Sequence, residues 1–597
     1  MKSIEDINLK KLTQNKDYYP SPDAWEEEVL YFLLVDRFSN GVEEEQYDPN
    51  SDYESAFASE DSRKAWERAG KRWNGGTLNG IKSKLDYLEE LGITAIWVSP
   101  ILKQVAFEET YHGYGAQNFL EIDSHFGSKE EFKELVDAAH ERGIYVILDV
   151  VLNHTGNVFQ YQENSPCYDG SEFSIKGFND GTGSPTISVS EPDFDKAWPD
   201  GGVWPKELMS AETFSQKGVI CDWDNFPEYV EGDFFTLKNI DTGYYQGDEF
   251  VPSQALKNLT EVFKYWIAYA DLDGFRLDTA KHLWTGAVRY FATHIHEFAT
   301  SIGKKNFYII GEITGGMEAA IDKIKHTGLD AALGINKVPE RLEQSAKGYT
   351  SPTKFFNVFK NINLPIEDHY KWYRDNVVTM FDDHDMATQP DLKERFCANE
   401  ETADLLLNAL FLNLMSVGIP CIYYGTEQGF DGSGRDDKYV REAMFGGKFG
   451  AFRSKGKHFF NQENQIYDEL SKIIEIRKEY ITLQQGRQYL RKVSYDGSNF
   501  VLPTKNDSAR YTGLIVWSRI LSSQEIVLAI NCSLENKHQV EAVVEKDLHE
   551  LGDKWECIYS CQAEQIGSES QIYNKQGNNV IKVSVPPSGA VVYKPKS

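Results

Sequence analysis

Residues 145–154 have the sequence YVILDVVLNH, in which a run of apolar residues ends in polar ones. A short, nearly continuous apolar run is typical of a strand that is buried on both faces of a parallel sheet. The same design recurs along the chain. The further runs are Leu30–Val35 (LYFLLV), Ala95–Val98 (AIWV), Gly274–Leu277 (GFRL), Phe307–Ile310 (FYII), Asn376–Phe381 (NVVTMF) and Cys421–Tyr424 (CIYY), with Leu329–Leu333 (LDAAL) as a weaker eighth.

Amphipathic segments separate these runs. Leu78–Leu91 and Phe132–Ala139 carry apolar residues at steps of three and four, the spacing of one helix face. Strands that alternate with helices predict βα units and a parallel sheet. Eight such units fit a closed (β/α)8 TIM barrel better than an open doubly wound sheet, which remains the alternative on pattern alone.

Two stretches interrupt this rhythm. Residues 155–240, after the third strand, are rich in Gly, Ser, Asp and Pro and lack a long helical pattern, which predicts an inserted irregular subdomain. The shorter polar stretch Gly41–Lys71 is predicted to be a long loop. Ile473–Tyr480 has helical spacing and precedes a change of pattern.

Beyond this helix, alternating segments such as Gly513–Ser518, Glu525–Ile530 and Val580–Val585 predict a C-terminal antiparallel β-sandwich domain. We therefore predict four parts: the first part of the barrel with an N-terminal extension (1–154), the inserted subdomain (155–240), the remainder of the barrel (241–488) and the C-terminal β-domain (489–597).

The composition excludes some partners. The formal net charge is −30, which disfavours nucleic acid and anionic membrane surfaces, because both attract positively charged proteins. A run of about 18 apolar residues, as a membrane span needs, does not occur. A neutral substrate is compatible with this charge, and the sequence does not indicate an oligomeric state.

The seven cysteines are odd in number and scattered, so we expect reduced thiols. The first 20 residues lack the apolar core of a secretory signal. Both observations predict a cytoplasmic protein.

Polar residues stand at or just after the ends of the apolar runs. The active site of a (β/α)8 barrel enzyme lies at these C-terminal ends of its strands. The polar residues are Asp149 and His154 after the third run, Arg276 and Asp278 at the fourth, Glu312 after the fifth, and His384 and Asp385 after the seventh. A network of salt bridges at the barrel rim is the purely structural interpretation of any one of them. Their joint placement at strand ends favours a catalytic site.

Cleavage of a glycosidic bond needs two carboxyl groups, one ionised and one protonated. Arg276 and Asp278 are two residues apart, so on a strand they face the same way, and we expect Arg276 to keep the pKa of Asp278 low. Glu312 follows an apolar run, and a poorly solvated carboxyl group has a raised pKa. These residues suit the two roles in that order.

Four blocks resemble the signature regions of glycoside hydrolase family 13, the α-amylase family, in both order and spacing. They are Asp149–His154 (DVVLNH), Gly274–His282 (GFRLDTAKH), Gly311–Ile313 (GEI) and Phe381–Asp385 (FDDHD). Tyr31–Gly41, Tyr111–Gly115 and Gly418–Gly429 also match. The resemblance runs from about Leu30 to Arg477, and four ordered blocks are specific where one alone is not.

The resemblance implies roles for individual residues. Asp278 would be the nucleophile, Glu312 the general acid/base, and Asp385 would bind sugar hydroxyls. The implied substrate-binding residues are His112, Tyr114, His154, Arg276, Lys281, His282 and His384. The pair Lys281 and His282 is typical of endo-acting members and favours an α-1,4-glucan or maltooligosaccharide substrate over sucrose or trehalose.

The resemblance also implies a structural Ca²⁺ between the barrel and the insertion, held by oxygen ligands. Asn153, Asn239 and the main-chain oxygen of His282 stand at the matching positions. The family usually has Asp where Asn239 stands, and Asn where Asp383 stands. The first departure predicts a weaker or absent ion, and the second places an extra acid beside His384 and Asp385.

The sequence therefore predicts a retaining α-amylase-type hydrolase of maltodextrin, starch or glycogen. An α-glucosidase or 4-α-glucanotransferase of the same family is the nearest alternative, since its first chemical step is the same. A catalytically inactive carbohydrate-binding or scaffold protein is the remote one, because all three carboxylates are present.

Overall fold

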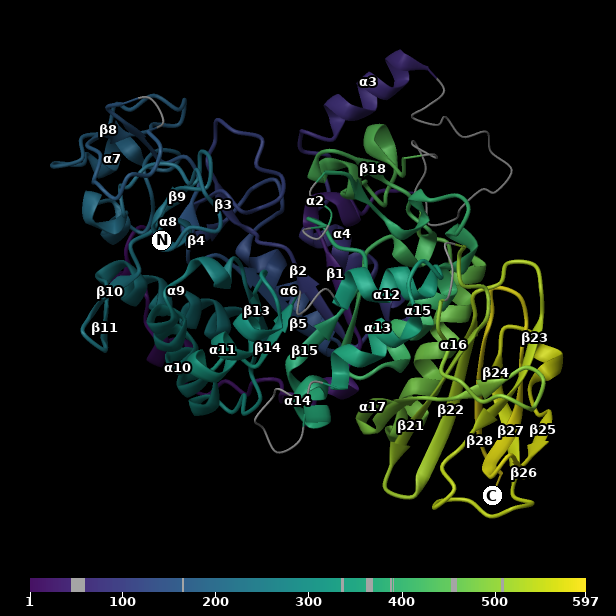
Figure 1. Ribbon diagram of the computed structural model, residues 1–597. Coiled ribbons are helices and arrows are strands. Elements are labelled where there is room, and N and C mark those ends of the chain that lie inside the picture. Colours follow the sequence, from purple (N-terminus) through teal and green to yellow (C-terminus); the bar gives the residue numbers. More distant parts are fainter. Residues whose placement is uncertain are drawn as a thin grey trace.

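The computed structural model describes residues 1–43, 59–163, 166–333, 338–360, 369–386, 389, 391–452, 459–505 and 509–596. Eight parallel strands close into a barrel near the centre of the molecule (Figure 1). In barrel order they are β1 (Leu30–Leu33), β17 (Ile419–Tyr423), β15 (Val377–Thr379), β14 (Ala331–Leu333), β13 (Tyr308–Glu312), β12 (Gly274–Leu277), β5 (Tyr145–Val150) and β2 (Ala95–Val98). The closed barrel, including its weak eighth strand, confirms the predicted fold, and the open sheet is excluded.

The register of three neighbouring strands sets up the site. Arg276 on β12 pairs with Asp149 on β5 and with Ile310 on β13. At the start of β12, a Cβ on Gly274 would lie 2.6 Å from the carbonyl oxygen of Tyr308, so this close approach of the strands needs a glycine. The carboxyl ends of β5, β12 and β13 therefore meet at one edge of the barrel.

Amphipathic helices cover the outside of the barrel. Among them are α6 (Lys129–His140), α9 (Gln254–Ala270), α10 (Thr285–Ser301) and α16 (Gln465–Glu479). Helix α6 begins with a capping box, in which the Ser128 hydroxyl accepts the Glu131 N–H and the Glu131 carboxylate accepts the Ser128 N–H. The predicted helix at Leu78–Leu91 is two helices, α4 (Leu78–Ser83) and α5 (Leu85–Leu91). In the described part of the chain, every helix is too short or too polar to cross a bilayer.

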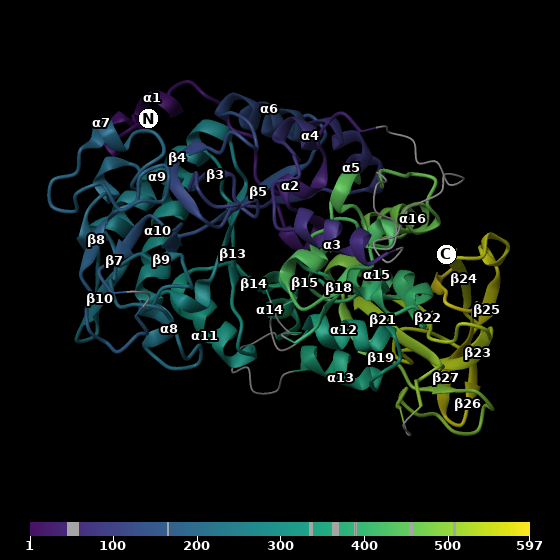
Figure 2. The same ribbon diagram turned by 90° about the horizontal axis from the view of Figure 1, so that it is seen from above.

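The segment after β5 forms an irregular lobe at the end of the molecule opposite the C-terminal domain (Figures 1 and 2). Its regular elements are short: β6 (His154–Thr155), β7 (Phe159–Tyr161), β8 (Ile175–Phe178), α7 (Phe194–Ala197), α8 (Glu228–Glu231) and β9 (Lys238–Asn239). Strands β6 and β9 pair with His154 opposite Asn239, so the two ends of the lobe meet beside the barrel.

The Gly41–Lys71 stretch is not only a loop, as the sequence predicted. Its described part contains helix α3 (Glu60–Ala69), capped by the Ser59 hydroxyl, while residues 44–58 lie outside the described residues. Trp66 of this helix is fully buried against Phe449 and Phe452. The segment is mostly polar, so the sequence did not reveal that Trp66 would be buried and hold the helix against the rest of the protein.

The C-terminal residues form two antiparallel sheets that pack face to face. One contains β19 (Arg487–Leu490), β21 (Leu514–Leu521), β22 (Gln524–Asn531), β28 (Ala590–Pro595), β24 (Lys554–Ser560) and β25 (Glu569–Gln571), and the other β20 (Val493–Ser494), β23 (His538–Val543), β27 (Asn578–Val585) and β26 (Tyr573–Lys575). Val516 and Val527 of the first share a buried core with Val540 and Ile581 of the second. The predicted sandwich is present.

The expectation of reduced thiols is wrong for two cysteines. Cys167 and Cys221, 54 residues apart in the inserted lobe, form a disulfide. Within the described residues the other five cysteines form no disulfide with one another; four of them are buried, and Cys561 is partly exposed. Scattered cysteines in a chain of this length do not reveal which pair the fold brings together.

We predict that thiol titration of the denatured protein finds five reactive groups before reduction and seven after it, because one disulfide hides two. The Cys167→Ser/Cys221→Ser variant should unfold at a lower temperature, by the equivalent of about 2–4 kcal/mol, since the cross-link restricts the unfolded chain. Seven groups without reductant would contradict the pairing.

Candidate active site

Arg276 lies at the centre of the barrel edge and contacts three carboxylates. Its Nη1 is 3.1 Å from Asp149 Oδ1 and 2.5 Å from Asp278 Oδ1, and its Nη2 is 2.9 Å from Glu312 Oε2. The arginine side chain is fully buried, whereas those of Asp278 and Glu312 are 8% and 19% exposed. One guanidinium therefore brings the predicted nucleophile and the predicted acid/base to one small volume.

Three carboxylates around one cation cannot all stay ionised at low cost in a buried site. Burial raises the pKa of Asp149 to about 8 and that of Glu312 to about 7, with Arg276 opposing both shifts. The expectation for Asp278 is corrected: burial raises its pKa although Arg276 lowers it, because the guanidinium is shared. Asp149, which the sequence placed only at a strand end, belongs to the same network.

The backbone after Asp278 fixes Glu312. Thr279 has φ 48°, in the left-handed region that a β-branched residue seldom adopts. In this conformation its N–H donates to Glu312 Oε2 at 2.9 Å. Strained residues of this kind persist where the surrounding structure holds them, and they cluster at functional sites.

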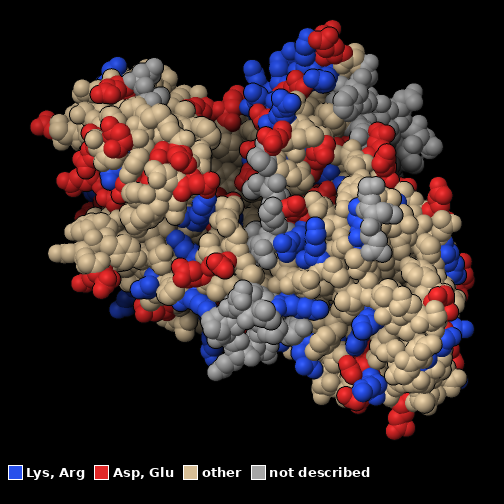
Figure 3. All heavy atoms as spheres, in the orientation of Figure 1, with Lys and Arg blue, Asp and Glu red and all other residues tan. Residues whose placement is uncertain are grey.

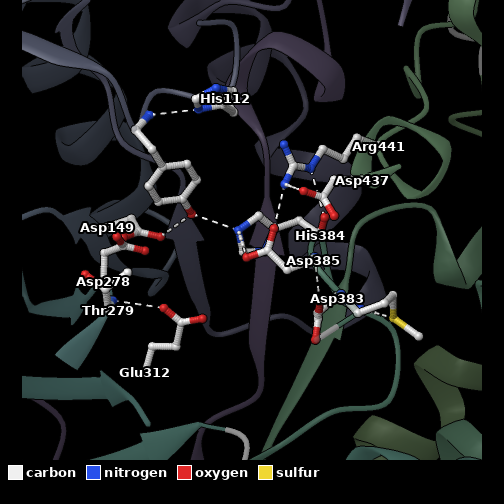
Figure 4. A network of polar contacts seen from close by, with 12 residues as sticks. His112, Asp149, Asp278, Thr279, Glu312, Asp383, His384, Asp385, Asp437 and Arg441 are labelled. Atoms are coloured by element: carbon white, nitrogen blue, oxygen red, sulfur yellow. Dashed lines mark hydrogen bonds and ion pairs between the residues drawn. The ribbon is translucent and has the colours of Figure 1, made fainter. Parts of the chain in front are cut away.

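Asp385 and His384 lie on the other side of the site (Figure 4). The Tyr114 hydroxyl donates to Asp149 Oδ2 at 2.9 Å and lies 3.0 Å from His384 Nε2. His384 Nε2 is 3.2 Å from Asp385 Oδ2. Burial lowers the pKa of His384 to about 3, so its ring is neutral at pH 7. Tyr114 thus connects the two sides of the site.

Two cations that the sequence did not single out hold Asp385. Arg441 Nη2 is 2.5 Å from Asp385 Oδ1, and its Nε donates to the His384 carbonyl at 2.8 Å. Lys393 Nζ donates to the Asp385 carbonyl, and both cations contact Asp437. Figure 4 shows Arg441 beside Asp385 and Asp437. Burial opposes ionisation of Asp385, but His384 and Arg441 hold its pKa well below the usual range.

The remaining predicted histidines are buried and neutral. Burial lowers the pKa of His112 to about 3 and that of His154 to about 4. His112 Nδ1 accepts the Tyr114 N–H at 3.1 Å. His154 Nε2 and His384 Nδ1 are buried and lack a hydrogen-bond partner within the described residues. Buried polar atoms of this kind are unusual in a folded protein and suit a bound ligand.

Lys281 and His282 lie where the barrel meets the inserted lobe. Lys281 Nζ is 3.8 Å from Asp224 and 5.4 Å from the centre of the Tyr229 ring. His282 Nδ1 contacts the Tyr229 carbonyl at 2.7 Å. Figure 3 shows a recess between this lobe and the part of the molecule that carries α3. The sequence predicted that Lys281 and His282 bind substrate, and the fold places them at the end of the site that faces the inserted lobe.

A family description, the catalytic domain of α-amylase, matches residues 32–486, most of the chain. The chain belongs to the α-amylase family.

Similar proteins agree with this assignment. An α-amylase of Streptomyces lividans is 27% identical over 479 residues, which is 74% of this chain and 50% of that protein. A β/α-amylase of Paenibacillus polymyxa is 28% identical and covers 81% of this chain and 33% of that protein. The chain thus spans half or less of these two relatives. The crystal structure of a Geobacillus thermoleovorans α-amylase complexed with acarbose shares the fold, with a TM-score of 0.65, 23% identity, and coverage of 96% of this chain and all of that one.

Asp383, where the family usually has Asn, stabilises the turn that carries Asp385. Its Oδ1 accepts the N–H groups of Asp385, at 2.6 Å, and of Met386. An amide oxygen could accept the same two bonds. Burial and the charge of Asp385 raise the pKa of Asp383 to about 6. The acid therefore adds a negative charge near Asp385 without adding a hydrogen bond.

The expected calcium ligands lie near one another, but the amide groups of Asn153 and Asn239 already donate hydrogen bonds to main-chain carbonyls. The Asn153 amide nitrogen donates to the His282 carbonyl at 2.8 Å, and that of Asn239 donates to the Val230 carbonyl at 3.2 Å. The nearby carboxylate of Asp233 pairs with Lys238 Nζ at 3.2 Å. Calcium requires six to eight oxygen ligands that point at one centre. The described residues do not fit this ion, and calcium binding stays a prediction that their geometry does not favour.

We predict that dialysis against EDTA leaves the melting temperature unchanged, because the hydrogen bonds of Asn153 and Asn239 already satisfy this junction. Differential scanning calorimetry with and without added Ca²⁺ measures the effect. A melting temperature that falls with EDTA and recovers with Ca²⁺ would restore the calcium site.

We predict that Asp383→Asn stabilises the protein at pH 7 to 8 but not at pH 4. The folded-state pKa of about 6 exceeds the ordinary 3.8, so ionisation costs stability as pH rises through this interval. The partly exposed group should contribute on the order of 1–2 kcal/mol. Thermal unfolding at several pH values measures it. Asp169→Asn is the matched control, because this exposed carboxylate also accepts a backbone N–H, from Ser171. A gain that does not depend on pH would contradict the explanation.

Proposed function

We propose that the protein is a retaining glycoside hydrolase that cleaves α-1,4-glucosidic bonds in maltodextrin, starch or glycogen-type glucans through a covalent glycosyl-enzyme. One observation carries the proposal: Arg276 contacts both Asp278 and Glu312, and the pKa of Glu312 is about 7. A carboxyl group with this pKa keeps its proton in a large fraction of molecules at neutral pH. That proton is what the leaving oxygen needs.

In the first step Asp278 attacks the anomeric carbon while Glu312 gives its proton to the oxygen of the leaving chain. The bond to that oxygen breaks, and an ester forms between the sugar and Asp278. In the second step Glu312, now ionised, takes a proton from water, whose oxygen attacks the same carbon and releases Asp278. The two displacements retain the α configuration. Arg276 stabilises the negative charge that moves between the two carboxylates.

The residues on the other side of the site suit the hydroxyl groups of the sugar. Asp385 is ionised and 35% exposed, so it can accept hydrogen bonds from the ligand. The free nitrogens of His154 and His384 can bond with further hydroxyls. Lys281 and His282, on the lobe side, would contact the leaving chain. Calcium has no part in these steps.

The disulfide favours a protein that folds in an oxidising compartment over the expected cytoplasmic one, because disulfides are rare in the cytosol. A glucanotransferase would use the same first step with a sugar as acceptor instead of water.

We predict that Asp278→Asn and Glu312→Gln each lower kcat for maltoheptaose by on the order of 10²–10⁴-fold or more with an unchanged fold. Glu318→Gln, an exposed acid six residues after Glu312, is the matched control and should keep full activity. Chromatography of the products also separates the alternatives, since longer oligosaccharides indicate transfer and glucose alone indicates exo-action. A wild-type protein inactive on every α-glucan, or full activity in either carboxyl variant, would reject the proposal.

A further inference from the structure

Three aromatic rings form a continuous surface beside the lobe end of the site. Phe226 in the inserted lobe lies 5.5 Å from Trp284, and Trp284 lies 5.8 Å from Tyr245, between ring centres. Tyr245 belongs to the hairpin of β10 (Gly243–Gln246) and β11 (Glu249–Pro252). We call Phe226, Trp284 and Tyr245 the aromatic track.

The track is exposed although its residues are large and apolar. Phe226 and Tyr245 are 58% and 40% exposed, and Trp284 is partly exposed. Isolated exposed aromatics need no explanation, but adjoining ones mark binding surfaces. Over the hairpin, at the left edge of Figure 3, the surface is mostly uncharged. A neutral ligand suits it better than a charged one.

The track is continuous with the active site through one short loop. Thr279 donates its N–H to Glu312 at one end of this loop, and Trp284 stands at the other, two residues after His282. Tyr229, which contacts His282, is also 5.9 Å from Phe226. A chain that leaves the site past Lys281 and His282 would therefore reach the aromatic track.

The hairpin extends the track into a hollow. Tyr245 lies 5.2 Å from Phe250, whose ring packs so closely on α10 that a Cβ on Gly286 would be 2.1 Å from it. A hollow of about 590 Å³ lies there, between Phe250 and Tyr290, with Asp248 and Arg289 at its walls. This volume falls within the range of small-molecule pockets, ~300–1,000 Å³. Apolar rings with a few polar groups suit a sugar, which has apolar C–H faces and hydroxyl edges.

We propose that the aromatic track and this hollow bind an α-1,4-glucan chain that extends beyond the cleft on the leaving-group side. The proposal rests on the proposed function and deepens it, because the protein would then prefer long chains. Phe226, Trp284 and Tyr245 would stack on successive parts of the polymer. A short oligosaccharide would end before reaching them.

Variants at Tyr245 and Trp284 test the proposal. The hairpin offers a matched control in Tyr244, which is 57% exposed but points to the other face of the strand than Tyr245. Tyr245→Ala and Trp284→Ala should weaken binding to amylose in native affinity electrophoresis by about fivefold each, equal to about 1 kcal/mol. They should raise KM for amylose similarly and leave kcat and KM for maltotriose or maltotetraose unchanged. Tyr244→Ala should match the wild type on both.

The outcomes separate this inference from the proposed function. A wild-type protein that cleaves no α-glucan rejects the function. A wild type that is active, with Tyr245→Ala equal to Tyr244→Ala on amylose, overturns the track alone. Size-exclusion chromatography tests the alternative that a second copy of the chain binds the aromatic track. A wild-type dimer that Tyr245→Ala dissociates would mean that a second copy, and not a glucan, covers these rings. If Trp284→Ala fails to fold, Tyr245→Ala on the exposed hairpin decides the question.

Discussion

The site depends on one buried guanidinium that serves three carboxylates. Because Arg276 contacts Asp149, Asp278 and Glu312 at once, none of the three has a cation to itself. Burial raises their pKa values, the neighbouring carboxylates add to this rise, and the shared guanidinium offsets only part of it, which favours a proton in the network. The strand register that puts Arg276 opposite Asp149 is therefore also what supplies a proton donor at neutral pH.

On the opposite side of the site, neighbouring cations favour the ionised form of one carboxylate, Asp385. Arg441 and Lys393 both hold the turn of Asp385, and the pKa of Asp385 is held well below its usual range. Tyr114 joins the two sides through its hydroxyl. The carboxyl groups of Glu312 and Asp385 thus differ in protonation because their neighbours differ, so that Glu312 can give a proton while Asp385 can accept hydrogen bonds from sugar hydroxyls.

Local pattern predicted the barrel strands, since each apolar run is a strand, and it placed Asp278, Glu312 and Asp385 at strand ends that meet at one edge. The role of Asp385 came from the resemblance of the four blocks to the family's signature regions. Features that depend on contacts between residues far apart in the sequence could not be predicted from local pattern. Arg441 lies 56 residues from Asp385, and Cys167 lies 54 from Cys221, so only the folded chain pairs them. The pKa of Asp278 depends on how many carboxylates share Arg276, which a spacing of two residues does not reveal.

The central claim is that Asp278 attacks the sugar while Arg276 leaves Glu312 its proton. Trapping the intermediate tests this most directly, with a fluorinated glucosyl fluoride that forms the glycosyl-enzyme but hydrolyses slowly. Peptide mass spectrometry of the trapped protein should place one sugar on Asp278, and proton NMR of an ordinary digest should give the α-anomer first. A sugar on another residue, or a β-anomer as the first product, would contradict the account.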